Sequence, residues 1–260
     1  TLFDADRVCI FAADHVYKMD VGQMIEYHLD KQADVTVAAN VVPSSEASAF
    51  GCIEADATGR ITGFVEKPEQ PPEIPGRPGF SYVSMGNYIF EREILEESLI
   101  EDAHLPTSHD FGRDIIPKLV PGARVFAYDF STNVLPGRQG FSWREDKPYW
   151  RDVGTIKTYW EAHMDLLEYN SEMTFYNPQW PMRTVSYADP PSYICPVEGR
   201  SCHVQSTLAA EGSRVLGAKV ELSVMSRNSV VLPGAEVEQS IIGEGVVIGE
   251  NCRLRKVIVD

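Results

Sequence analysis

Three charged residues stand at the ends of strand-like runs and are suited to phosphate chemistry. Asp14 follows the apolar run RVCIFAA, Lys67 follows ITGFVE, and Asp152 lies in YWRDVGT. Two carboxylates at the ends of neighbouring elements can share one Mg²⁺ that is bound to a phosphate and keeps water in its remaining positions. A lysine in such a place is a point charge suited to a phosphate monoester. These residue types indicate a phosphate-handling site.

Each of the three residues also has a structural explanation. Asp14 can cap a turn, and Asp152 can pair with Arg151 or cap the next helix. A lysine on a protein surface is usually only solvated. The chain lacks GxGxxG and GxxxxGK[ST] phosphate loops, and its histidines show no paired metal spacing. The residues alone therefore leave both explanations open.

The composition indicates a globular protein and argues against several partners. The 260 residues include 23 Lys plus Arg and 38 Asp plus Glu, a net charge of −15 that argues against nucleic-acid binding. No apolar stretch approaches the roughly 18 to 20 residues that cross a bilayer, so no membrane partner is expected. The five cysteines form no CxxC pair, which fits a reducing cytoplasm without a disulfide framework or a zinc site.

The elements that must position these residues alternate between strand and helix. The run from Arg7 to Ala13 predicts a strand buried on both faces of a mainly parallel sheet. Asp20 can cap a helix whose apolar residues recur at helical spacing up to Leu29. Residues 35–41 alternate as a strand should. This order predicts a βαβ unit in an α/β domain.

Shorter signals fill the rest of this domain. They predict a hairpin over 51–66 with a DATG turn, a strand over 84–90, a helix over 91–99, a helix over 110–120 that Pro117 ends or kinks, a strand over 125–130 and a polar loop over 133–147. A last helix is expected to run to about Asn170 and to bury one face, formed by Ile156, Tyr159, Trp160, His163 and Leu167.

A six-residue rhythm begins after a proline-rich linker. The pieces LGAKV, LPGAEV, IGEGVV and IGENCR repeat an aliphatic residue followed by Gly or Pro. Three such repeats make one coil of a parallel β-helix, whereas ordinary hairpins, the alternative, impose no period. The predicted domains are 1–172, a linker over 173–205, and 206–260. Because the rhythm stops uncapped, we expect an internal fragment of a longer protein.

Six motifs, in chain order, resemble those of the bacterial ADP-glucose pyrophosphorylase family of sugar-phosphate nucleotidyltransferases. They are ADHVYKMD, SAFG, FVEKP, SMGNY, SHDFGRDIIP and YWRDVGT, and the resemblance covers essentially the whole chain. It implies a Rossmann-like, mixed and mainly parallel sheet, followed by a left-handed parallel β-helix of hexapeptide repeats. SAFG together with SHDFG points to the ADP-glucose branch of the family.

The resemblance also implies a reaction and a site. ATP and glucose 1-phosphate would give ADP-glucose and pyrophosphate in glycogen biosynthesis. Asp14 and Asp152 would hold a catalytic Mg²⁺, and Lys67 would bind the phosphate of glucose 1-phosphate. Glucose itself would meet Gly51 and Glu66, with Ser84, Asp110, Phe111 and Trp150 lining the same pocket. The whole protein would be a cytoplasmic homotetramer regulated by small-molecule allosteric effectors.

Departures from the family pattern leave alternatives open. Ala13 stands where the family usually has Gly, and the glycine-rich ATP loop of the family would lie upstream of Thr1, so the fragment alone is expected to be inactive. Because that segment reads the base, a UDP- or dTDP-glucose pyrophosphorylase remains an alternative. A non-catalytic regulatory subunit is another, although such subunits are expected to lose Asp14, Lys67 or Asp152. A hexapeptide acyltransferase would need a histidine within 216–260, which has none.

Overall fold

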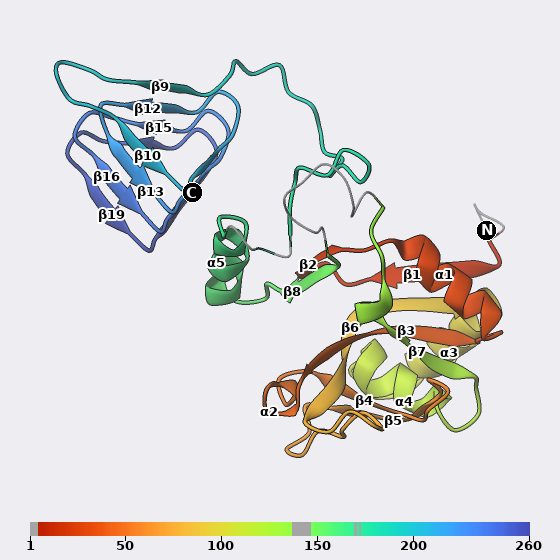
Figure 1. The fold of residues 1–260 in the computed structure, drawn as a ribbon. Coiled ribbons are helices and arrows are strands. Elements are labelled where there is room, and N and C mark those ends of the chain that lie inside the picture. Colours follow the sequence, from red (N-terminus) through yellow and green to blue (C-terminus); the bar gives the residue numbers. More distant parts are fainter. Residues whose placement is uncertain (1–4, 137–146, 169–170, 172) are drawn as a thin grey trace. The chain divides into compact units, whose positions relative to one another are not determined.

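The computed structural model describes residues 5–136, 147–168, 171 and 173–260 (Figure 1). Contacts divide the chain into unit 1, Thr1–Leu135, and unit 2, Pro136–Asp260, and each unit is described by itself. The predicted loop over 137–146 and the predicted helix end near Asn170 lie outside the described residues. The domain boundaries at 172 and 205 stay predictions.

Unit 1 is built on a six-stranded mixed sheet in the order β5-β4-β6-β3-β7, with β1 also paired to β6. The strands of the unit are β1 (Arg7–Phe11), β2 (His15–Lys18), β3 (Val35–Pro43), β4 (Gly51–Ala55), β5 (Ile61–Glu66), β6 (Phe80–Glu91) and β7 (Val125–Asp129). The helical segments are α1 (Val21–Asp30), α2 (Ser44–Ala47), α3 (Arg92–Ala103), the π-helical turn η1 (Phe111–Ile115), α4 (Ile116–Leu119) and the 3₁₀ turn η2 (Phe130–Thr132).

The direction of the strands corrects one prediction. The mixed sheet is confirmed, but β6 runs antiparallel to β1, β3 and β4, and β4 runs antiparallel to β5. Among the pairings described within unit 1, β3 with β7 is the parallel one, so the sheet is not mainly parallel. Strand β1 is also not buried on both faces, because β6 is its one partner in this sheet and its residues are exposed or partly exposed.

Helix α1 covers one face of the sheet. Asp20 caps it as predicted, since its carboxylate accepts a hydrogen bond from the Gly22 amide at 2.9 Å. His28 is buried against the sheet, with Nδ1 2.8 Å from Oγ1 of Thr36 on β3 and Nε2 3.2 Å from Oε1 of Glu91 on β6. A polar bridge therefore joins this helix to two strands.

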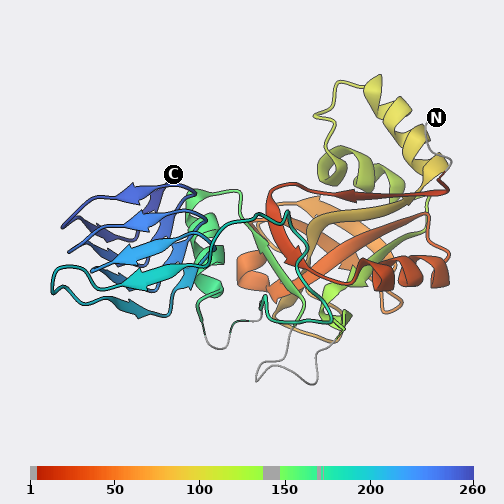
Figure 2. The same ribbon diagram turned by 90° about the horizontal axis from the view of Figure 1, so that it is seen from above.

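Helices α3 and α4 cover the opposite face (Figure 2). Val35 and Val37 flank Thr36, and side chains alternate along a strand, so these valines point away from α1. They belong to the main core cluster, together with Leu95 of α3 and Ile116 of α4. The larger apolar core of unit 1 therefore lies between β3, β6 and these two helices.

The hairpin and the helix near 110–120 show how turn residues act. The predicted hairpin is confirmed as β4 and β5, and its turn includes Gly59 at φ +85°, a conformation that favours glycine. The predicted helix over 110–120 forms as η1 followed by α4. Pro117 lies in the first turn of α4, where a missing N–H costs nothing, so it begins this helix instead of ending one.

Unit 2 contains β8 (Tyr149–Asp152), helix α5 (Ile156–Asp165) and a parallel β-helix. The three sides of the β-helix are sheets in the orders β9-β12-β15-β18, β10-β13-β16-β19 and β11-β14-β17-β20 (Figure 1). Their strands are β9 (Tyr193–Cys195), β10 (His203–Gln205), β11 (Leu208–Ala209), β12 (Arg214–Leu216), β13 (Lys219–Glu221), β14 (Val224–Met225), β15 (Val230–Val231), β16 (Glu236–Glu238), β17 (Ile241–Ile242), β18 (Val247–Ile248), β19 (Arg253–Arg255) and β20 (Ile258–Val259). Among the residues described, no helix is both long and apolar enough to span a membrane.

The left-handed β-helix is confirmed, with a coil that differs in length from the expectation. The register advances by 17 residues from Glu236 to Arg253, one residue short of three hexapeptides. The short side runs from Val237 to Ile242 and turns at Gln239, whose φ is +49°. A left-handed residue at this corner lets the chain turn in one residue fewer.

Buried hydroxyls satisfy the backbone beside these corners. The Ser240 amide donates to Oγ of Ser223 at 3.1 Å, and the Val257 amide donates to Oγ of Ser240 at 3.3 Å. Each serine hydroxyl donates in turn to a carbonyl of its own coil, at Glu221 and Glu238, over 2.7 Å. Stacked serines thus pair backbone groups that would otherwise be buried without partners.

Helix α5 corrects the predicted buried face. Thr155 caps the helix in a capping box with Thr158. Ile156 is 81 % exposed and Tyr159 42 % exposed, so these two residues do not belong to a buried face. Trp160 instead binds the β-helix through its indole N–H, which donates to the Gln239 carbonyl at 2.8 Å. One aromatic residue, and not an apolar stripe, makes this contact.

Acidification should destabilise the parent protein more than the variant His28→Gln. Burial lowers the pKa of His28 in the folded state, whereas in the unfolded chain it titrates near the ordinary value of about 6.5. Below that pH the unfolded state binds more protons, so stability falls as the pH falls. We expect the difference in Tm between parent and variant to narrow from pH 7.5 to 5.5. A matched variant of the exposed His203, His203→Gln, should show no narrowing, and a constant gap for His28→Gln would contradict the assignment.

Ile242→Ala should destabilise the β-helix far more than Val247→Ala. Ile242 is fully buried in the core of the coils, whereas Val247 on the neighbouring side is 60 % exposed. Loss of a buried isoleucine costs about 3 kcal/mol, and a surface truncation about 0.5 kcal/mol or less. Urea unfolding of both variants measures the difference. Equal losses would show that the inward register is wrong.

Candidate active site

One cavity of unit 1, of about 300 Å³, gathers residues from β1, β4, β5, β6 and η1. Five of the residues implied by the family resemblance lie on its wall, namely Gly51, Glu66, Ser84, Asp110 and Phe111. They come from segments up to 60 residues apart in the chain, and the sheet brings them together. The hairpin supplies the first two, β6 the third, and the turn η1 with its cap the last two.

Close approach of the hairpin strands explains the glycine in this wall. Gly51 on β4 lies opposite Glu66 on β5. A Cβ at Gly51 would come within 2.8 Å of Oε2 of Glu66 and 3.0 Å of the Phe64 ring. Only glycine leaves room for the carboxylate in this position. An ionised Glu66 can then accept hydrogen bonds from the hydroxyls of a sugar.

Lys67 lies beside this carboxylate and not on the cavity wall. Its Nζ is 3.7 Å from Oε1 of Glu66, and its side chain is 61 % exposed. The backbone of Lys67 has φ +50°, and its amide donates to the Phe50 carbonyl at 3.0 Å. This left-handed residue directs the chain away after β5. The ammonium group therefore stays open to solvent next to the cavity, where an anion can reach it.

Tyr88 is a wall residue that the sequence motifs did not single out. Its ring stacks on Phe111 with centroids 5.6 Å apart, and its hydroxyl lies 3.4 Å from Oγ of Ser84. Burial raises the pKa of Tyr88, which keeps the phenol protonated and able to donate. Ser84 and Tyr88 are four residues apart on one strand, and the even spacing that puts them on one face was the available signal.

A bulge in β6 shapes the wall between these two residues. Gly86 has φ +73°, and a Cβ there would lie 3.0 Å from Cβ of Ala12. The Ala12 amide donates to the Gly86 carbonyl at 3.1 Å, which ties the end of β1 to the bulge. The glycine of SMGNY is therefore required by its backbone conformation. Ala13, which stands where the family usually has Gly, is exposed.

Asp110 is held at the start of the π-helical turn. Its Oδ1 accepts a hydrogen bond from the Arg113 amide at 2.8 Å, and its own amide donates to Oδ2 of Asp114 at 3.1 Å. Single π-helical turns are rare and are common at functional sites. Here the turn places Phe111 against Tyr88 while Asp110 remains exposed at the cavity.

Asp14 and Asp152 lie in different units, so the structure does not test their predicted pairing. Asp14 is exposed on the bend between β1 and β2. Asp152 is partly buried at the end of β8, which also carries Trp150. Among the described residues, neither carboxylate takes part in a hydrogen bond or an ion pair. Both remain available to a ligand.

The structural explanations for Asp152 are not seen. Arg151 pairs with Asp165 at 2.8 Å and lies 3.4 Å from Glu161, both on α5, instead of pairing with Asp152. The cap of α5 is Thr155. These contacts hold β8 to α5 and leave the Asp152 carboxylate out of the network.

The donor set suits a magnesium ion that is shared with a substrate. In the described part of the chain, no group of three His, Cys, Asp or Glu residues could hold a metal ion alone. Mg²⁺ commonly takes one or two carboxylates together with substrate phosphates and water. Asp14 and Asp152 have the chemistry for such a site.

Comparisons with known proteins agree with both parts of the fold. A family model described as nucleotidyl transferase matches residues 1–169, and one described as GlmU-like, C-terminal hexapeptide matches residues 190–260. Among similar relatives, glucose-1-phosphate adenylyltransferase 1 of Vibrio parahaemolyticus is 46 % identical over 260 residues, 100 % of this chain and 63 % of its own length. The glucose-1-phosphate adenylyltransferase of Aliivibrio fischeri is 45 % identical over 258 residues, 99 % of this chain and 62 % of its own length.

A more distant bacterium gives the same result. The glucose-1-phosphate adenylyltransferase of Thermodesulfovibrio yellowstonii is 43 % identical over 256 residues, 98 % of this chain and 60 % of its own length. The chain thus spans less than two thirds of the length of these curated relatives. The family model, the mixed sheet with its cavity, and the β-helix that follows agree with one another: the chain belongs to the nucleotidyl transferase family.

Proposed function

We propose that the protein carrying this chain is a glucose-1-phosphate adenylyltransferase, which transfers AMP from ATP to glucose 1-phosphate and releases pyrophosphate. The observation that carries the proposal is the cavity of unit 1, on whose wall lie five residues that the family resemblance assigns to glucose 1-phosphate. The names of the similar relatives support the same reaction.

The cavity has the chemistry that a sugar needs. Glu66 offers a carboxylate and Asp110 a second one, which accept hydrogen bonds from ring hydroxyls. The stacked rings of Tyr88 and Phe111 give an apolar wall for the C–H face of the sugar, and the Tyr88 hydroxyl can donate. A rigid wall of this kind orients the substrate and lowers the entropic part of the barrier.

The phosphate groups would meet the charged residues around this wall. Lys67 would bind the phosphate of glucose 1-phosphate, whose oxygen forms the new bond to the α-phosphorus of ATP as the bond to pyrophosphate breaks. Asp14 and Asp152 would hold Mg²⁺, which when bound offsets negative charge on the phosphates. Such a transfer needs positioning and charge compensation, so no nucleophilic side chain is required.

The properties of the whole protein follow the same proposal. We infer a cytoplasmic homotetramer that serves glycogen biosynthesis and responds to small-molecule allosteric effectors. The family resemblance supports these inferences, and the five cysteines, all free thiols, are compatible with a reducing compartment.

The test of the function is a substrate panel on the full-length protein. Pyrophosphate release with glucose 1-phosphate should be fastest with ATP, slower with UTP or dTTP, and lost when Mg²⁺ is removed by EDTA. A preference for UTP or dTTP would replace ADP-glucose by another nucleotide sugar. A purified protein that is inactive alone but activates a partner would make it a regulatory subunit.

Lys67→Ala should raise the KM for glucose 1-phosphate about 10- to 100-fold and leave the KM for ATP nearly unchanged. The reason is the loss of a charge-assisted contact to one substrate only. Initial rates at varied concentrations of each substrate measure the split. Lys157→Ala, whose side chain is 83 % exposed on α5, is the control and should change neither value. An equal rise in both KM values would reject the role of Lys67.

A further inference from the structure

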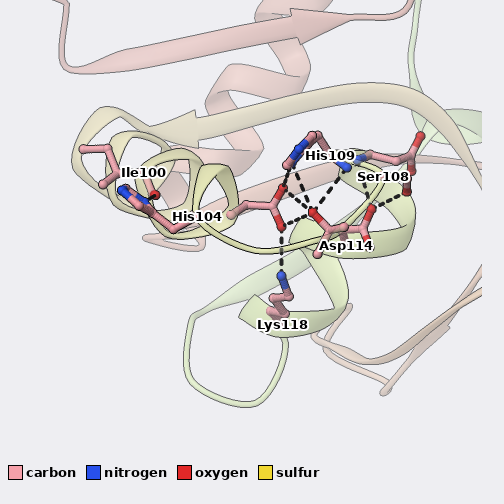
Figure 3. Close-up of polar contacts among 9 residues, drawn as sticks. Ile100, His104, Ser108, His109, Asp114 and Lys118 are labelled. Atoms are coloured by element: carbon pink, nitrogen blue, oxygen red, sulfur yellow. Dashed lines mark hydrogen bonds and ion pairs between the residues drawn. The ribbon is translucent and has the colours of Figure 1, made fainter.

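A buried carboxylate lies under the loop that leads into the cavity. Asp102, in the last turn of α3, is 4 % exposed and is not part of the cavity wall. It accepts hydrogen bonds from Oγ1 of Thr107 at 2.9 Å, Nδ1 of His109 at 2.7 Å and Nζ of Lys118 at 2.9 Å. Figure 3 shows His109 and Lys118 approaching this point from two sides of the loop. The carboxylate therefore connects α3, the loop and α4.

The charge on Asp102 strengthens these bonds. Hydrogen bonds from Lys118 and His109 hold the pKa of Asp102 at about 2, so the group is ionised throughout the neutral range. Hydrogen bonds to an ionised acceptor are about twice as strong as neutral ones. Because a carboxylate can only accept, Nδ1 of His109 must carry the proton in this bond.

The bond to His109 holds an unusual backbone conformation. His109 has φ +58°, in the left-handed region that residues other than glycine rarely adopt. The next two residues, Asp110 and Phe111, are wall residues of the cavity. The conformation at His109 thus sets the direction in which the chain enters the cavity, and the bond from its ring to Asp102 stabilises that conformation.

A second carboxylate fixes the other side of the loop. Asp114 accepts hydrogen bonds from the Ser108 hydroxyl and from the Asp110 amide, the latter at 3.1 Å. Figure 3 shows Ser108 and Asp114 facing each other across the loop. The loop is therefore held on both sides of His109, and the two anchors differ in one respect. Asp114 lies within the turn that carries the wall residues, whereas Asp102 lies on a separate helix.

We propose that Asp102 and His109 are positioning residues for glucose 1-phosphate, acting through the left-handed turn that places Asp110 and Phe111 on the cavity wall. The inference rests on the proposed function for the identity of the sugar phosphate. It adds two residues that do not touch the substrate but determine how tightly it is held.

The test compares two variants of His109 in the full-length protein. His109→Ala removes the bond to Asp102 and should raise the KM for glucose 1-phosphate about tenfold, with little change in the KM for ATP. His109→Asn should restore the KM to within about twofold of the parent, because Nδ2 of asparagine is as many bonds from Cα as Nδ1 of histidine. Asparagine also tolerates the left-handed backbone. A purely structural role would not produce this split or this rescue.

A neighbouring histidine provides the matched control. His104 bonds to the Ile100 carbonyl at 2.7 Å and makes no contact with the loop anchors, as Figure 3 shows. His104→Ala should leave both KM values unchanged. Hydrogen exchange over residues 107–115 gives a second readout, and it should be faster in His109→Ala but not in His104→Ala.

The outcomes separate the two proposals. An active parent in which His109→Ala leaves the KM for glucose 1-phosphate unchanged, or raises both KM values equally, overturns the positioning role alone. A parent with no adenylyltransferase activity overturns the proposed function and the sugar named here. Unchanged hydrogen exchange in His109→Ala overturns the anchoring of the loop whatever the activity.

Discussion

Strand β6 is the element on which the geometry of unit 1 depends. It pairs along its length with β3 and on its other edge with β4 and then with β1. The change of partner coincides with the bulge at Gly86, where the chain takes a positive φ and β1 ends against it. Ser84 and Tyr88 flank this bulge and face the cavity. A cavity in the surface of a sheet is possible here because one strand changes partners at this point.

Two kinds of support then surround the cavity. Aromatic packing of Tyr88 and Phe90 on Phe111 forms a rigid wall, with ring centroids 5.6 and 5.7 Å apart. Hydrogen bonds to Asp102 and Asp114 hold the loop before that wall, where apolar packing is not available. The apolar support resists lateral movement, whereas the ionic support fixes the direction of the backbone. A site that discriminates hydroxyl positions needs both, because small displacements change every hydrogen bond.

Local chemistry could be predicted from the sequence better than the arrangement of elements. The cap at Asp20, the turn of the β4–β5 hairpin and the repeats of the β-helix depend on neighbouring residues, and all of them are seen. Strand direction could not be predicted, because an apolar run does not reveal its partners. Five predicted wall residues meet, yet Tyr88 was missed because its role depends on Phe111, 23 residues away. Ile156 fits a helical stripe but faces solvent, since periodicity does not show whether a partner is present.

The coil of 17 residues has a consequence for how this β-helix can change in length. Equivalent residues stack at this spacing, so Glu236 lies above Arg253 and Glu238 above Arg255, at 3.5 Å within each pair. Insertion of a single residue would move every later side chain out of its column, and aliphatic residues would turn outward. Removal or duplication of a whole coil would keep every column intact, because each coil contacts only its neighbours. The β-helix is thus a modular spacer whose length can vary only in steps of one coil.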